Sequence, residues 1–152
     1  MPTEPLSTKE ILTEINSQWT AGNVDSTTPI FIEATGTGTD STADALRFDL
    51  NRGDIMVSRP GSPSFEEEPI GNWLYGNRTY NITMEIYTRK DRQQLYNLMR
   101  EVRRICHARK HSLTNFQRLQ FMAFTEETTE QVNLWFGIAN LQVVNQMVLL
   151  ET

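Results

Sequence analysis

The sequence contains one cysteine and two histidines among its 152 residues, and it has no long hydrophobic run. A single cysteine cannot form an internal disulfide, which is consistent with a reducing compartment. The longest apolar runs, such as residues 147–150, have about four residues, whereas crossing a bilayer takes roughly 20. The N-terminus, MPTEPLSTKE, has acids and prolines where a signal peptide needs positive charge and then an apolar block. We therefore expect a protein of a cytoplasm-like compartment that makes no membrane contact.

The sparse histidine and cysteine content also argues against catalysis and against a metal site. His107 and His111 share a helix face, but Cys106 lies about 100° from His107, and a closed zinc site needs four ligands. A Ser or Cys triad would need one of these two histidines, and both fall at the end of a basic helix. No phosphate-binding glycine pattern is present, and the acidic triplet at 66–68 is typical of a solvated loop. We expect no enzymatic activity, cofactor or metal.

The length and the hydrophobic content of 38% fit one domain over residues 1–152, without internal repeats. The net charge of -5 argues against general binding of polyanions. The charge is unevenly distributed, because residues 88–118 carry +7 and the remainder carries -12. Such segregation suits self-association or docking through complementary surfaces.

The N-terminal third predicts a helix followed by short strands. Ser7 and Glu10 form a capping box, so a helix should begin at about Thr8 and stop near Gly22. Alternating apolar residues then predict strands around 30–33, 46–50 and 54–60. The Gly- and Thr-rich stretch 35–44 is expected to be a mobile loop, and RGD at 52–54 is interpreted only as a turn.

The rest of the chain carries the strongest patterns. Residues 79–88 alternate as a strand, and residues 118–124 and 131–150 predict a hairpin in which Gly137 marks a bulge or a close approach. Between them, one helical stripe should face the core: Leu95, Leu98, Met99, Val102, Ile105 and Cys106. We therefore predict an α+β fold: a mainly antiparallel sheet packed by an N-terminal helix and a central amphipathic helix, as a two-layer sandwich.

Residues 58–78 contain three prolines, three glycines and the acidic triplet, which predicts an extended connection without regular structure. Loops of this length are usually functional or disordered. Its aromatic residues Phe65, Trp73 and Tyr75 either tuck under the loop or wait for a partner.

The central helix also has a basic flank opposite its core stripe. On a helical wheel, six residues fall within about 120°: Arg89, Arg92, Arg100, Arg103, Arg104 and His107. The strip is about 27 Å long. Because the rest of the chain is so acidic, we favour carboxylates of a neighbouring subunit or loop as its partners, with nucleic-acid phosphate second.

Residues 54–109 run through the strand DIMVSRP, a long loop with an aromatic, the strand RTYNITMEIYT and the helix DRQQLYNLMREVRRI. This arrangement resembles the tail-terminator or tail-completion proteins of the neck of long-tailed bacteriophages. The resemblance implies an α+β virion subunit, assembled in the host cytoplasm, that forms a hexameric ring. The ring would cap the tail tube protein, join the head-tail connector protein and let genomic DNA pass.

We expect the interface with other subunits or partners to include two sets of residues. They are Arg89, Arg92, Arg100, Arg103 and Arg104 on the helix, and Phe65, Glu66, Glu67, Glu68 and Trp73 in the long connection. The alternative is a small nucleic-acid-binding accessory protein that uses the basic flank of the helix.

Overall fold

The computed structural model describes residues 7–24, 28–33, 50, 53–60, 64–70, 73–113, 116–128 and 132–149. The elements, in chain order, are α1 (Ser7–Gln18), η1 (Ala21–Val24), β1 (Ile30–Glu33), β2 (Ile55–Pro60), β3 (Ser64–Ile70), β4 (Trp73–Thr88), α3 (Arg92–Ala108), β5 (Arg118–Glu127) and β6 (Trp135–Leu149). The loop predicted at 35–44, residues 46–49 of the strand predicted at 46–50 and the Ser7 side chain of the capping box lie outside the described residues or side chains. Leu50 itself lies in a turn.

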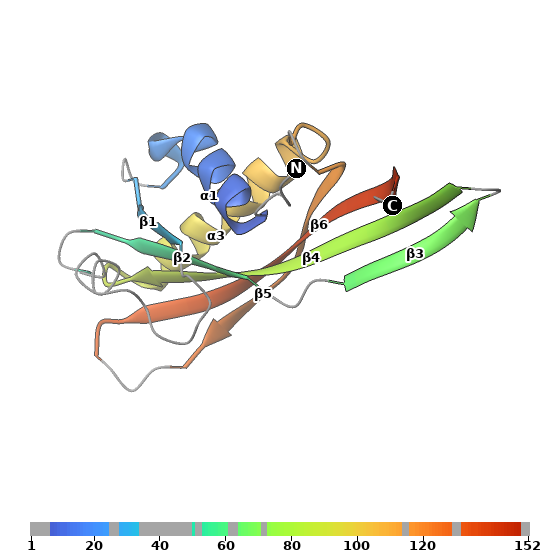
Figure 1. Ribbon diagram of the computed structural model, residues 1–152. Coiled ribbons are helices and arrows are strands. Elements are labelled where there is room, and N and C mark those ends of the chain that lie inside the picture. The colour runs from blue at the N-terminus through green and yellow to red at the C-terminus, as the bar shows by residue number, and fades with distance from the viewer. Residues whose placement is uncertain are drawn as a thin grey trace.

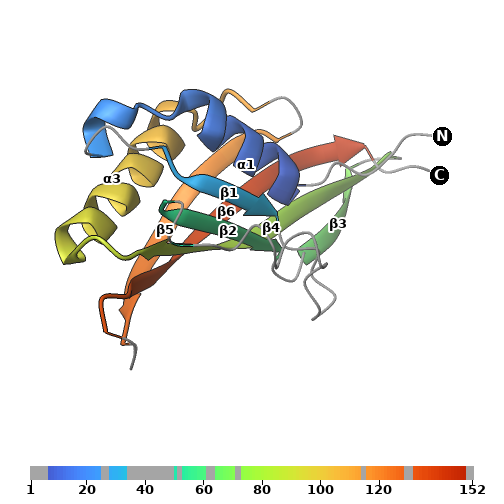
Figure 2. The same cartoon turned by 90° about the vertical axis from the view of Figure 1, so that its left-hand side faces the viewer.

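The strands form one sheet in the order β1-β2-β4-β6-β5, and β3 pairs with the N-terminal half of β4. Only β1 and β2 pair in parallel, and the other pairs are antiparallel. Both α-helices lie on one face of this sheet (Figures 1 and 2). The α+β prediction of a mainly antiparallel sheet covered by two helices is confirmed.

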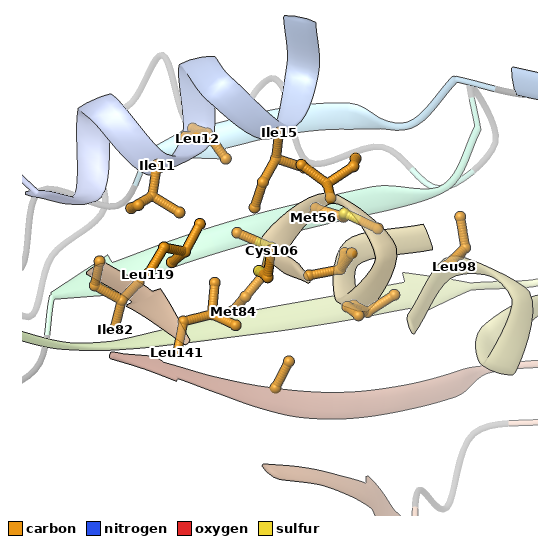
Figure 3. Packing of buried hydrophobic residues seen from close by; sticks show 14 of the residues in the cluster. Ile11, Leu12, Ile15, Met56, Ile82, Met84, Leu98, Cys106, Leu119 and Leu141 are labelled. Carbon is orange, nitrogen blue, oxygen red and sulfur yellow. The ribbon is translucent and has the colours of Figure 1, made fainter. Parts of the chain in front are cut away.

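The core lies between the helices and the sheet, where α3 presents the predicted stripe (Figure 3). Leu98 and Ile105 of α3 are fully buried with Met84 of β4, and Ile11 of α1 joins the same cluster. The alternation of β4 sends Ile82, Met84 and Ile86 into this core. Asp91 begins α3 by accepting a hydrogen bond from the Gln94 backbone N–H at 2.7 Å.

The first helix begins where the sequence predicts, but it ends at Gln18, four residues before the predicted stop at Gly22. Trp19 leaves the helix and packs edge-on against Phe31 of β1, with ring centroids 5.8 Å apart. Gly22 belongs instead to the short helix η1. The predicted stop at Gly22 was therefore wrong, and the first residue after the helix makes a tertiary aromatic contact instead of continuing it.

Residues 64–70 and 73–79 form a hairpin, so the prediction of an irregular connection at 58–78 was wrong. The two strands pair in continuous register from Ser64 opposite Thr79 to Ile70 opposite Trp73. Acidic residues and proline have low strand propensity, so pairing with β4 must supply what the local sequence does not. We call β3, residues 73–79 of β4 and residues 144–149 of β6 the arm, which projects beyond both helices (Figure 1).

Gly137 lies in β6 at the close approach that was predicted as one of two alternatives. A side chain there would overlap the ring of Phe124 on β5 and come within 3.2 Å of the Thr125 carbonyl oxygen. The irregularity in the β5–β6 pairing lies elsewhere, between Phe121 and Ala123. Met122 at this bulge is half exposed. The bulge bends an edge strand, which protects it against unwanted pairing.

Candidate interaction surface

The exposed flank of α3 carries the predicted arginines, but the structure divides them by partner. Arg92, at the start of the helix, forms a bidentate pair with Glu126 of β5, at 2.9 Å between Nη2 and Oε2. Tyr96 donates to the same carboxylate at 2.7 Å. The hydrogen bonds from Arg92 and Tyr96 lower the pKa of Glu126. Arg92 therefore serves a contact within its own subunit.

Arg104 is also bound internally, by a carboxylate one helical turn away. Its Nε lies 3.0 Å from both oxygens of Glu101, and its Nη2 donates to the Gln18 carbonyl oxygen at 3.0 Å. Glu101 is only 2% exposed. It also accepts from the Thr20 backbone N–H at 3.2 Å and from Asn23 Nδ2 at 2.9 Å. These contacts attach α3 to the end of α1 and to η1.

Burial by itself raises the pKa of Glu101. Hydrogen bonds from Arg104, Asn23 and the backbone of Thr20 outweigh burial, so this pKa lies below its ordinary value. Glu101 is consequently a charged structural group at neutral pH. Removing Arg104 would leave the buried Glu101 carboxylate without its charged partner. Arg104 therefore mainly stabilises the fold of its own subunit.

Arg100 and Arg103 differ from these two residues because both are exposed and neither has a carboxylate partner in the described part of the chain. Arg89 is exposed just before the helix and makes contacts of its own. On the flank predicted as one strip, Arg92 and Arg104 are therefore paired with carboxylates of their own subunit. The positive charge without such a partner lies toward the C-terminal half of α3.

A groove of about 240 Å³ runs between α3 and the edge strand β5. We call it the basic seam. Its lining consists of Arg103, Cys106, His107, Lys110, Leu119, Gln120 and Phe121. Three of these residues are basic or ionisable to a cation, and the partly buried Phe121 supplies apolar surface beside the fully buried Leu119. Among the residues described, none that lines it is acidic.

Cys106 and the two histidines do not converge on a common point. Cys106 is buried in the core, and burial raises the pKa of its thiol to about 12. His107 and His111 are exposed, and His111 Nδ1 lies 3.1 Å from the Gln117 carbonyl oxygen. In the described ranges no three His, Cys, Asp or Glu side chains are grouped so that they could hold a metal ion. A thiol with such a pKa is protonated at neutral pH and is a poor nucleophile.

The remaining predicted interface residues lie on the arm. Phe65 and Glu66–Glu68 belong to β3, and Trp73 is the first residue of β4, opposite Ile70. The sheet order puts β3 on the β2 side of β4, whereas β5 lies beyond β6 on the other side. The arginines lie on α3, which packs over β4, β5 and β6, whereas the arm projects beyond that helix, so the fold does not bring the two predicted sets together (Figure 1).

Sequence reasoning missed Lys110 as a site residue, although its charge entered the local sum. Lys110 and Arg103 are seven residues apart, and this spacing puts two residues on the same side of a helix. The described helix ends at Ala108, yet the following turn keeps Lys110 in the lining of the seam. The spacing could have found it. Within the residues described, no helix has the length and apolar character to span a membrane.

Comparison with known proteins gives a likeness of fold only. No known family matches the sequence. No curated protein matches it either. Among solved structures, the chain is similar to a chain of the "Virion of native gene transfer agent (GTA) particle", at 7% identity and a TM-score of 0.58. The alignment covers 92% of this chain and 94% of that one, so the two share a fold over nearly their whole lengths.

Proposed function

We propose that this protein is a structural, non-enzymatic component of a phage-like virion, and more specifically a ring-forming subunit of the tail-terminator kind. The observation that carries the proposal is the end-to-end likeness of fold to a chain of a gene transfer agent virion. The resemblance of residues 54–109 to tail terminators supports it from sequence. Its partners would be further copies of itself, a tail tube protein and a head-tail connector protein.

The charge distribution supports assembly into a closed ring. Rings are built from heterologous contacts, which need two different and complementary surfaces on every subunit. The acidic strand β3 and the basic seam are two such surfaces, and they lie at opposite edges of the sheet. A net charge of -5 would also let genomic DNA pass a central opening with little non-specific adhesion.

The test is the mass of the purified protein by light scattering, combined with negative-stain images. We expect a ring whose mass is six times that of one chain. Association should weaken as salt is added, since the proposed contacts are electrostatic. A protein that stays a strict monomer at high concentration and low salt would overturn the proposal.

The alternative, a nucleic-acid-binding accessory protein, draws on the uncommitted cations Arg100, Arg103 and Lys110. It predicts that R100Q/R103Q weakens DNA binding and makes its salt slope shallower by about 2. The matched control is T13E/N16E, which makes the same change in net charge on the exposed side of α1. If only R100Q/R103Q affects the slope while the protein stays monomeric, the alternative replaces the ring proposal.

A further inference from the structure

We propose that the acidic β3 edge of the arm of one subunit docks into the basic seam of the next copy. This inference rests on the proposed function, because it names the two surfaces that would repeat around the ring. It goes further by committing to a particular pairing, in which carboxylates of the triplet Glu66–Glu68 bind Arg103 and Lys110. The partner of the seam is therefore a second copy of this chain.

The seam has charge available for a partner. Arg103 and Lys110 have no carboxylate partner in the described part of the chain, unlike Arg92 and Arg104. His107 lies between them along the helix and is exposed. The described acids that pair with arginines of α3 or its C-cap are Glu101 of α3, Glu126 of β5 and Glu14 of α1, and none of them lines the seam. An acidic segment would thus meet positive charge that no described carboxylate neutralises.

The seam also has an apolar side that an entirely charged ligand would not use. Phe121 is partly buried there at the edge of the core cluster, and Leu119 beneath it is fully buried. In β3 the acidic triplet is preceded directly by Phe65. The sequence of β3 thus supplies counterparts to both kinds of group that line the seam, an aromatic ring and carboxylates for its cations. Purely electrostatic ligands such as phosphate match only one.

The outer edge of β3 in the arm is available to a neighbouring subunit. β3 is hydrogen-bonded to β4 along one edge, and no described strand pairs with its other edge. Neither helix packs on β3 in the described residues, and Figure 1 shows the hairpin projecting past them. Its seven residues carry three negative charges and no positive one. An edge strand that is acidic avoids pairing with itself, since like charges would meet.

Geometry prevents the two surfaces from meeting within one subunit. β3 lies on the β2 side of β4, and the seam lies along β5, with β6 between β4 and β5. A contact between them must therefore be made by two copies, head to tail. Such a contact uses a different surface on each partner and closes into a ring when its rotation allows.

The experiment is a charge exchange, read as mass by light scattering and as ring images. R103E/K110E and E66K/E67K/E68K each put like charges opposite one another, so we expect association to weaken roughly 100-fold in each. Mixing the two variants, or combining all five changes in one chain, should restore assembly. Recovery is the decisive result, because a merely misfolded variant would not be rescued by its counterpart.

The milder pair R103Q/K110Q covers the case in which charge reversal disturbs folding. We expect its association to weaken roughly tenfold, while T13E/N16E, with the same change in net charge, assembles like the wild type. Rings that persist in both reversed variants, or losses that the exchange does not restore, overturn the docking of β3 in the seam and leave the ring proposal intact. A monomeric wild type overturns both.

Discussion

The helix-covered part of the sheet and the arm share one strand, yet they are built differently. In the covered part, Ile82, Met84 and Ile86 of β4 are fully or almost fully buried beneath α1 and α3. In the arm, the same strand continues with β3 and β6 beside it and no helix above it (Figure 1). We therefore expect the covered part to contribute most of the stability, and the proposed contacts with other chains fall on the arm.

The largest loss of stability is expected from a mutation that creates a cavity in the covered part. Leu98 of α3 is fully buried, and Leu98→Ala should lower the free energy of unfolding by about 2–5 kcal/mol. Urea unfolding at fixed protein concentration measures it. The control is Met122→Ala on the exposed bulge of β5, which should stay within about 0.5 kcal/mol. Equal effects at the two sites would mean that the core has been misplaced.

The next largest loss of stability is expected at Glu101, whose hydrogen bonds connect α3 to Thr20 and Asn23. Glu101→Ala leaves the Thr20 N–H and the Asn23 amide without their acceptor, which should cost about 1–3 kcal/mol of unfolding free energy. The half-exposed position of Arg104 keeps the value below that of a fully buried pair. Thermal unfolding of this variant should show the loss.

Glu101 also predicts a dependence on pH. Its pKa in the folded protein is below the ordinary 4.5, so its contribution to stability is fully present above pH 4.5 and disappears as the pH falls through the lowered pKa. Glu101→Gln should lose stability at pH 7 and vary less between pH 5 and acid than the wild type. A variant with the same acid profile as the wild type would remove Glu101 from this role.

A smaller effect is expected where β5 and β6 approach closely. Gly137→Ala would put a methyl group into the space of the Phe124 ring, which must shift, and we expect a loss of about 1–2 kcal/mol. Gly22→Ala is the control, since an added methyl group there meets no atom within 4 Å. Denaturant midpoints of the two variants should differ clearly, and equal midpoints would show that β5 adapts freely.

The smallest effect on stability should come from the arm. Neutralising its strand by E66Q/E67Q/E68Q is expected to change the unfolding free energy by less than about 0.5 kcal/mol, because no described helix packs on β3. The same variant should assemble less well than the wild type when its mass is measured. A large loss of stability with unchanged assembly would reverse the comparison and make the arm part of the folding unit.

The elements that sequence alone predicted are those stabilised by their own local pattern. The stripe of α3 and the alternation of β4 at 79–88 each repeat often enough to identify the buried face. β3 escaped prediction because SFEEEPI has little strand propensity and owes its conformation to residues 73–79 of a neighbouring strand. The predicted end of α1 was also wrong, and there too a tertiary contact is involved, because Trp19 packs against Phe31, twelve residues later in the chain.

The candidate surface was predictable to the same extent. Helical geometry placed the arginines on one flank, and it correctly separated Cys106 from His107. Helical geometry could not show which arginines pair with carboxylates of their own subunit. The partner of Arg92 is Glu126, which comes from a distant strand. The partner of Arg104 is Glu101, which also accepts hydrogen bonds from Thr20 and Asn23, far away in the sequence.

The continuity of β4 has a mechanical consequence. This strand runs from Trp73 at the far end of the arm to Thr88 next to α3, and it is paired with β6 along most of that length. Ladder hydrogen bonds lie across the strands, so tension applied along β4 loads them in shear, all together instead of one after another. A subunit held by its arm would therefore transmit the pull to its own core through these paired strands, with no loop between the arm and the core.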